Sequence, residues 1–144
     1  MPPERDYSGT PLPRKLGIKP GTTLALLDAP DGFAGMLQPL PPGVRVVTRA
    51  RGELDVVVLF VTRRGRLAER FPAAAARLAP DGGLWIAWPK KSSGVATDLD
   101  FDVVQSTGLD AGLVDNKVCA IDATWTALRF VVRLADRPAR AQRG

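Results

Sequence analysis

Apolar residues in this chain fall into short uninterrupted runs. "TTLALLDA" (22–29), "DVVVLFVT" (55–62) and "GLWIAW" (83–88) are apolar at nearly every position. Runs of this length between turn residues are typical of strands buried on both faces of a parallel sheet. "GVRVVTRA" (43–50) predicts a further, shorter strand.

Helical spacing appears in the segment 63–80. Its apolar residues recur on one face, and they are Leu67, Phe71, Ala74, Ala75 and Leu78. We expect Pro72 to bend this helix or to divide it into two pieces. The sequence "PDGG" (80–83) then predicts a turn before the apolar run that follows.

A second helix is expected over 97–108, with Thr97 or Asp98 as its N-cap. Its first turns carry several aspartates, which the positive end of the helix dipole stabilises. Gly108 predicts the end of this helix, because glycine is the usual residue just past a helical C-terminus.

Two closing strands, 113–121 and 125–134, are joined by a short turn. Alternating strands and helices predict a three-layer, Rossmann-like α/β fold with a mostly parallel sheet and a C-terminal antiparallel hairpin. This element order is similar to the Rossmann-like fold of methyltransferases. We expect a partly ordered segment over 1–13, a single domain over 14–134 and a basic flexible tail over 135–144.

Composition narrows the function classes. The chain has 144 residues, one cysteine, no histidine and a net charge of +5. The absence of histidine removes the commonest general base and metal ligand, which argues against an enzyme and predicts no metal site. No apolar run is long enough to cross a membrane, and "MPPERDYSG" lacks the apolar core of a secretory signal. We therefore expect a cytoplasmic protein.

Basic and hydroxyl side chains follow two neighbouring strands. The loops "VTRRGR" (61–66) and "WPKKSSG" (88–94) both leave a strand at its carboxyl end, the edge of an open α/β sheet where ligands bind. A helix N-terminus near either loop would also favour an anion. The candidate anion-binding residues are Arg63, Arg64, Lys90, Lys91, Ser92 and Ser93. Two solvated, solubilising loops are the alternative interpretation.

The turn after the first strand, "LDAPDGFAG" (27–35), is where a dinucleotide would bind. It lacks the glycine fingerprint, and its aspartates would repel a pyrophosphate. S-adenosylmethionine is the alternative cofactor, because Asp28 could meet its positive groups; Gly32 and Asp55 are expected beside it. The second strand ends in "VVTRA" without the acidic residue that would bind ribose. An ordinary turn with Asp31 as the N-cap of a short helix is the remaining interpretation.

Three further residues have structural interpretations. Cys119 lies between small apolar residues and is expected to be buried. Alternation along the strand places Trp85 and Trp88 on opposite faces of the sheet. Trp125 covers a sheet edge or marks a partner surface, and a homodimer is compatible with the closing hairpin.

Four stretches together resemble a bacterial family catalogued as domain of unknown function 3052. They are "YSGTPLPRKLGIKPG", "LDVVVLFVTRRGRL", "LAPDGGLWIAWPKKSSGVATDL" and "GLVDNKVCAIDATWTALRFVVR". The resemblance spans residues 6 to 134 and implies a small, single-domain, cytosolic protein. It assigns no reaction and no catalytic residues.

Three functions follow from these patterns. The first is a non-enzymatic binding or regulatory domain without a cofactor, which presents a basic sheet edge to an anionic small molecule or a protein. The second is a divergent methyltransferase-like protein that uses S-adenosylmethionine. The third is a weak nucleic-acid binder that uses the same basic edge and the arginine-rich tail.

Overall fold

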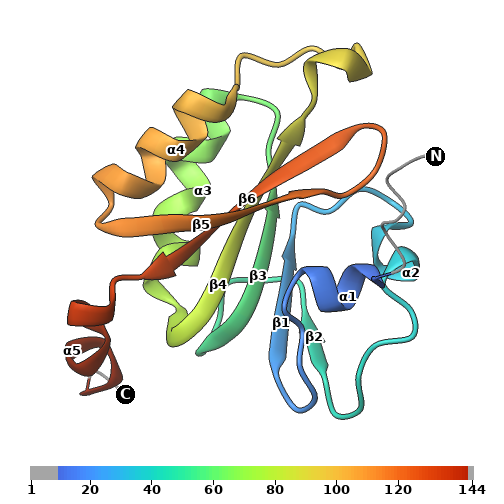
Figure 1. Ribbon diagram of the computed structural model, residues 1–144. Coiled ribbons are helices and arrows are strands. Elements are labelled where there is room, and N and C mark those ends of the chain that lie inside the picture. Colours follow the sequence, from blue (N-terminus) through green and yellow to red (C-terminus); the bar gives the residue numbers. More distant parts are fainter. Residues whose placement is uncertain (1–9, 143–144) are drawn as a thin grey trace.

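The computed structural model describes residues 10–142, which form one six-stranded mixed sheet (Figure 1). The strand order across the sheet is β2-β1-β3-β4-β6-β5. The strands are β1 (Thr23–Leu27), β2 (Arg45–Val47), β3 (Leu54–Phe60), β4 (Leu78–Pro89), β5 (Leu113–Ala120) and β6 (Trp125–Val132).

The direction of the strands confirms the predicted fold class. The pairs β1–β2, β1–β3 and β3–β4 are parallel, whereas β6 runs antiparallel to both β4 and β5. The body of the sheet is therefore parallel and the C-terminal hairpin is antiparallel, as expected for this Rossmann-like α/β arrangement.

Helices lie on both faces of the sheet (Figure 1). One face packs against α3 (Arg64–Ala76) and α4 (Phe101–Asp110), through side chains such as Leu67, Phe71 and Val104. The other face is covered by the shorter α1 (Leu12–Lys15) and α2 (Phe33–Met36), with Leu16 and Phe33 in the core. Within the described residues, no helix has the length and apolar character needed to cross a membrane.

The predicted alternation of the two tryptophans is confirmed. Trp85 packs with the α1 and α2 face, and its Nε1 donates to the backbone oxygen of Leu16 at 3.0 Å. Trp88 packs with the α3 and α4 face. Cys119 is buried, as expected, and Trp125 lies edge-on to Phe60 with ring centroids 5.0 Å apart.

The predicted turn at "PDGG" is wrong, because β4 continues through these residues. Its register against β3 shifts between Leu54 and Val56, so the extra residues form an irregularity in the strand and not a turn. Glycine is required there because a Cβ on Gly82 would lie 2.7 Å from the backbone oxygen of Asp55.

Three helix predictions are also corrected. Pro72 lies inside one continuous helix, α3, and does not divide it, whereas the predicted bend stays a prediction. Gly108 is a buried residue within α4, which ends at Asp110. The N-cap of α4 is Asp100, whose Oδ1 accepts from the backbone N–H of Val103 at 2.9 Å.

The first short helix has a different cap from the one expected. Gly32, with φ of 86°, is the N-cap of α2, and no side chain caps this helix. Asp31 lies one residue earlier and does not cap it. A residue with positive φ ends the preceding turn, and glycine adopts that conformation without strain.

The two ends of the chain are described in part. Residues 1–9 of the predicted N-terminal segment lie outside the described residues. After a 3-10 turn, η2 (Leu134–Asp136), the chain forms α5 (Arg137–Gln142). Arg140 Nη1 donates to the backbone oxygens of Ala75 and Leu78, at 2.8 and 2.9 Å. The flexibility predicted for the tail stays a prediction.

Candidate functional site

The strand order sets where a ligand is expected. From β1 the chain adds β2 on one side of the sheet, and it then crosses to β3 on the other side. In open α/β sheets, ligands bind outside the carboxyl ends of the strands at this reversal of strand order. The reversal here lies between β1 and β3, so the residues that follow β1 and the helix that follows β3 meet at it.

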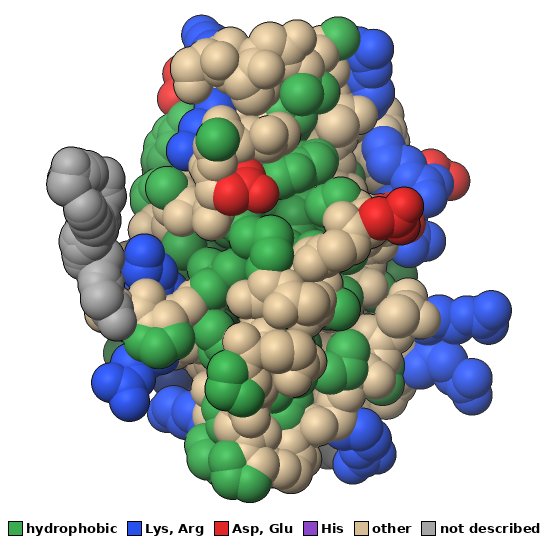
Figure 2. Space-filling model, turned by 90° about the vertical axis from the view of Figure 1, so that its right-hand side faces the viewer, with side chains coloured by type: hydrophobic (Ala, Val, Ile, Leu, Met, Phe, Trp, Pro, Cys, Tyr) green, Lys and Arg blue, Asp and Glu red, His purple; other side chains and the backbone are tan. Residues whose placement is uncertain are grey.

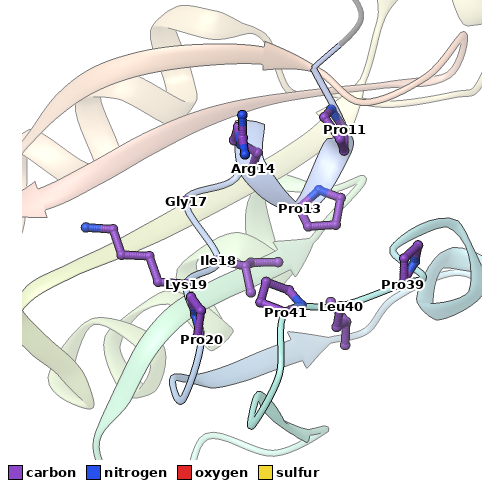
Figure 3. A pocket seen from close by; sticks show the side chains of 10 residues that line it. All are labelled: Pro11, Pro13, Arg14, Gly17, Ile18, Lys19, Pro20, Pro39, Leu40 and Pro41. Carbon is purple, nitrogen blue, oxygen red and sulfur yellow. The ribbon is translucent and has the colours of Figure 1, made fainter.

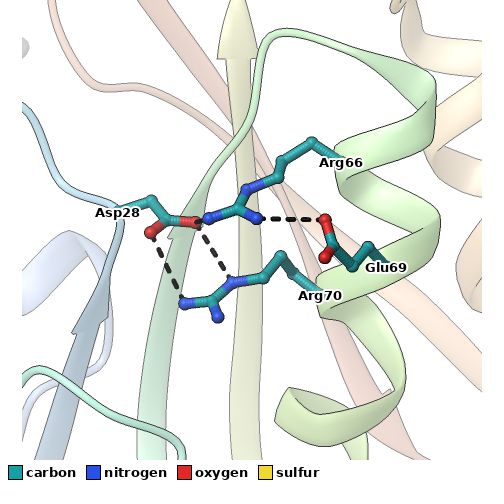
Figure 4. A network of polar contacts seen from close by, with 4 residues as sticks. All are labelled: Asp28, Arg66, Glu69 and Arg70. Atoms are coloured by element: carbon teal, nitrogen blue, oxygen red, sulfur yellow. Dashed lines mark hydrogen bonds and ion pairs between the residues drawn. The ribbon is translucent and has the colours of Figure 1, made fainter.

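Asp28 follows β1 directly at this point. Its φ of 57° places it in the left-handed region, where few residues other than glycine are found. Asparagine and aspartate tolerate this conformation better than most residues, but it still stores strain, and strained residues gather at functional sites. The carboxylate of Asp28 is held by two arginines of α3 (Figure 4).

The contacts of Asp28 form a small ionic network. Arg66 Nη2 lies 3.4 Å from Oδ2, and Arg70 reaches both carboxylate oxygens, with Nε 3.2 Å from Oδ2 and Nη2 3.4 Å from Oδ1. Arg66 Nη1 also donates to Glu69 Oε1 at 3.0 Å. The two arginines are one helical turn apart, so both project from the same face of α3.

These contacts keep Arg66 firmly charged. The hydrogen bond to Glu69 and the negative charge of Asp28 raise the pKa of Arg66 above its ordinary value. Side chains in the network are between a third and two thirds exposed, so an anion in solution can reach them.

Beside this network lies a hollow of ≈ 700 Å³, which we call the arginine hollow. Its lining comes from the end of β1, the segment after β2 and the outer face of α3. The lining residues are Leu27, Thr48, Arg49, Ala50, Arg51, Glu69, Arg70 and Ala73. Three arginines and one glutamate therefore surround the hollow.

The hollow exists because the connection between β2 and β3 is short. Two parallel strands usually need a crossover of a dozen or more residues, most often with a helix that covers the sheet. Here residues 48–53 alone make the crossing. Ala50 packs on the core beside Val47, but there is no helix in this crossover to fill the space next to α3.

Arg49 and Arg51 bring uncompensated charge to the hollow. Both are exposed, and the backbone N–H of Arg51 donates to the backbone oxygen of Arg49 at 3.0 Å, which makes a tight turn. Within residues 10–142, neither guanidinium has an ion pair. Guanidinium groups present several N–H donors in a plane that matches phosphate and carboxylate oxygens.

The loops that carry the predicted anion residues leave the same edge of the sheet. Arg63 and Arg64 are exposed after β3, and Lys90 follows β4. Thr97, three residues after the second loop, ties this part of the chain to the first loop by donating from Oγ1 to the backbone oxygen of Thr62 at 2.6 Å. Their binding role stays a prediction.

Local hydrogen bonds already use part of the predicted donor set. Lys91, Ser92 and Ser93 form a 3-10 turn, η1 (Lys91–Ser93). Ser93 Oγ donates to the backbone oxygen of Lys90 at 2.6 Å and accepts from the backbone N–H of Val95. The hydroxyl of Ser93 therefore stabilises the loop, whereas Lys91 and Ser92 are exposed.

Carboxylates of the chain occupy both nearby helix N-termini. Asp98 Oδ1 accepts from the backbone N–H of Arg64, the first residue of α3, at 2.7 Å. Asp100 caps α4 in the same way. A bound anion would have to displace these carboxylates to reach either helix end, so the helix N-termini add less to the basic loops than the sequence suggests.

The alternative cofactor residues do not form one site. Asp28 and Gly32 lie beyond the carboxyl end of β1, but Asp55 lies near the amino end of β3, where its Oδ2 accepts from the backbone N–H of Thr23 at 2.8 Å. Because parallel strands begin at the same edge, Asp55 is at the opposite edge from Asp28. Grouping the three residues around one cofactor was therefore wrong.

Sequence reasoning missed Arg49, Arg51 and Arg70, and it did not connect Arg66 with Asp28. Arg66 was included with the basic loop 61–66 but not paired with Asp28, and Arg70 has the spacing of the solvent side of an amphipathic helix. Arg49 lies at the polar end of a short predicted strand, and Arg51 lies in the predicted turn that follows it. Strand order together with the six-residue crossover could have found them. Among the described residues, no group of three or more aspartate, glutamate or cysteine side chains could hold a metal ion.

Comparisons with known proteins add little. No family model matches the chain, so the resemblance to the domain of unknown function 3052 family stays a prediction. No curated protein matches it either. Among solved structures, a structure of LepI in complex with SAM matches with a TM-score of 0.47 and 13% identity. That match covers 85% of this chain and 39% of the LepI chain, so this chain spans well under half of its length.

Proposed function

We propose that this protein is a non-enzymatic binding domain that takes a small phosphate-bearing molecule into the arginine hollow. The observation that carries the proposal is the convergence of Arg49, Arg51 and Arg70 from two separate segments on one hollow at the reversal of strand order. A cytoplasmic location and a regulatory role belong to the same proposal.

The size and charge of the hollow support this ligand class. Small-molecule sites in proteins usually enclose roughly 300–1,000 Å³, and this hollow has ≈ 700 Å³. An uncompensated guanidinium gains more from a phosphate than from water, because the charged hydrogen bonds are short and often paired.

The residue type at the end of β2 points to a phosphate and not to a plain ribose. In dinucleotide-binding folds this position carries an acidic residue that binds ribose hydroxyls, or an arginine nearby that accepts a phosphate on the ribose. Here Arg49 follows β2 by two residues, and Arg51 lies on the same short connection. A phosphorylated sugar or nucleotide therefore fits better than an unphosphorylated one.

The two other functions have less support. S-adenosylmethionine carries a positive sulfonium, and the carboxylate that would attract it, Asp28, is already paired with Arg66 and Arg70. Nucleic acid favours a long basic stripe, often with aromatic side chains for stacking. The arginine hollow is local, and Leu27 is the largest apolar side chain in its lining.

A calorimetric comparison of matched nucleosides tests the proposal. Adenosine 2′,5′-bisphosphate is expected to bind, and adenosine and S-adenosylmethionine are expected to bind far more weakly. Replacing Arg49 and Arg51 with glutamine removes two charge-assisted contacts and should weaken binding by roughly 10- to 100-fold. Arg77→Gln is the matched control, because Arg77 is exposed at the far end of α3. Equal binding by the double variant and the control would contradict the proposal.

A further inference from the structure

A second cationic hollow lies at the amino edge of the parallel strands, on the far side of the sheet from the arginine hollow. It has a volume of ≈ 230 Å³, and we call it the lysine hollow. Its charged lining residues are Lys15, Lys19, Lys117, Arg129, Asp55 and Asp81. They come from five separate segments of the chain, so the fold itself gathers them.

The charge of the lysine hollow is only partly balanced by its own acids. Asp55 is held by the backbone N–H of Thr23, and no ion pair joins either aspartate to Lys19, Lys117 or Arg129 within residues 10–142. Lys19, Lys117 and Arg129 alone outnumber the two aspartates of the lining, which leaves a net positive hollow. An anion would neutralise this excess.

Arg129 is the most constrained of these cations. It is half-buried on β6, and its guanidinium lies against Gly83, where an added Cβ would meet its Nε. Its Nη1 donates to the neutral amide oxygen Oδ1 of Asn116 at 3.4 Å. Burial, followed by the positive charge of Arg137, lowers the pKa of Arg129 below its ordinary value. A half-buried arginine without a carboxylate is costly, and a bound anion removes that cost.

An apolar groove adjoins the lysine hollow (Figure 3). We call it the proline groove, and it encloses ≈ 540 Å³ between the segment around α1 and the loop before β2. Its apolar lining consists of Pro11, Pro13, Ile18, Pro20, Pro39, Leu40 and Pro41. Figure 2, which views this side of the molecule, shows apolar side chains over the middle of the face, acidic side chains in its upper part, and lysine and arginine side chains toward the rim.

The two cavities meet at Gly17 and Lys19, which line both of them. In Figure 3 the side chain of Lys19 extends away from the prolines, so its ammonium lies apart from the apolar lining. Gly17 adds no side chain to the ridge between the two cavities, and a Cβ placed there would meet open space. A ligand can therefore pass over Gly17 from one cavity into the other.

We propose that the proline groove and the lysine hollow together bind one amphipathic anion, with its apolar chain in the groove and its phosphate or carboxylate head in the hollow. The groove is lined mainly by apolar side chains, and the hollow is lined mainly by charged ones, with Val56 as the one apolar side chain among the described residues that line it. Only a molecule with both parts uses both cavities. This site is distinct from the arginine hollow at the opposite edge and does not depend on the function proposed there.

A chain-length series tests the proposal on the intact protein. The probes are inorganic phosphate, butyl phosphate, hexyl phosphate and hexanol, each kept below the concentration at which it aggregates. Affinity measured by calorimetry should rise from inorganic phosphate to hexyl phosphate, by up to about fourfold for each methylene that enters the groove. Hexanol, which lacks the anionic head, should bind at least tenfold more weakly than hexyl phosphate.

Charge-removing variants locate the head group. Lys19→Gln with Lys117→Gln should weaken hexyl phosphate by tenfold or more, and Arg77→Gln, an exposed arginine outside both cavities, should not. Equal affinity for inorganic and hexyl phosphate, equal affinity for hexanol, or no binding would each overturn the proposal. Loss of hexyl phosphate on replacing Arg49 and Arg51 would also overturn it, and would leave the function proposed for the arginine hollow standing.

Discussion

The packing of α4 on the sheet can be tested at Gly108. A Cβ at this position would lie 2.0 Å from Cε1 and 2.3 Å from Cδ1 of Phe130. Carbon atoms in contact normally lie about 3.5–4.0 Å apart, so either the ring or the helix has to move by roughly 1 Å or more. Phe130 is fully buried and packs edge-on against Phe71, with ring centroids 6.0 Å apart, so the ring has little room.

The size of the effect follows from two opposing contributions. Overpacking a core lowers the free energy of unfolding by about 1–3 kcal/mol, and the better helix propensity of alanine offsets about 1 kcal/mol of this loss. Because the clash is with a rigid ring, the upper part of that range applies, and Gly108→Ala should lower the free energy of unfolding by about 1–2 kcal/mol. For a chain of this size that is a fall in Tm of roughly 2–8 °C.

Urea unfolding followed by tryptophan fluorescence measures this change, provided that the slope with denaturant stays constant. Gly65→Ala is the matched control, because Gly65 lies in α3 and an added Cβ would meet nothing within 4 Å. The control should keep or raise stability, by up to about 1 kcal/mol. If Gly108→Ala is as stable as Gly65→Ala, the contact between α4 and Phe130 described here is wrong.

Three further predictions follow from the charged and buried groups. Asp28→Asn keeps a residue type that tolerates positive φ, and it removes the negative charge that pairs with Arg66 and Arg70. Adenosine 2′,5′-bisphosphate should then bind about threefold more tightly, because removing one charge at roughly 6 Å in water changes the Coulomb energy by that factor. Weaker binding in calorimetry would contradict this prediction. Asp98→Ala removes the carboxylate that accepts from the first N–H of α3 and should lower the free energy of unfolding, measured in urea, by about 1 kcal/mol. An unchanged urea midpoint would show that this hydrogen bond does not stabilise the fold. Burial raises the pKa of the Cys119 thiol above its ordinary value of about 8.5, so the thiol favours folding below the unfolded pKa and loses that contribution as the pH rises through the folded pKa. The free energy of unfolding of the protein should therefore fall relative to that of Cys119→Ala above roughly pH 8.5. A constant difference between the two proteins up to about pH 10 would refute this.

The strands could be predicted from sequence because buried parallel strands are marked by apolar content alone. Errors arose where one residue type has two structural uses. Gly82 and Gly83 signal a turn in isolation, but in the fold they allow close approach of the Asp55 backbone and the Arg129 guanidinium. Gly108 signals a helix end, but it makes room for Phe130. Both uses depend on contacts distant in sequence.

The candidate site was only partly predictable for the same reason. The carboxyl edge of the sheet followed from element order, and Asp28 could be selected because it directly follows the first strand. Its pairing with Arg66 and Arg70 could not be predicted, since both arginines lie on a helix more than thirty-five residues later in the sequence and have the spacing of an ordinary solvent-exposed face. Grouping Asp55 with Asp28 was an error that the sequence itself could have avoided, since Asp55 stands at the start of its apolar run and Asp28 stands at the end of another. In a parallel sheet these two ends lie at opposite edges.

The most direct test of the proposed function is a titration of adenosine 2′,5′-bisphosphate into the protein, the Arg49→Gln, Arg51→Gln variant and the Arg77→Gln control at one fixed ionic strength. The account predicts saturable binding to the protein and the control, and a loss of roughly 10- to 100-fold in the double variant. Binding that is the same in all three proteins would contradict the claim that the arginine hollow is the ligand site.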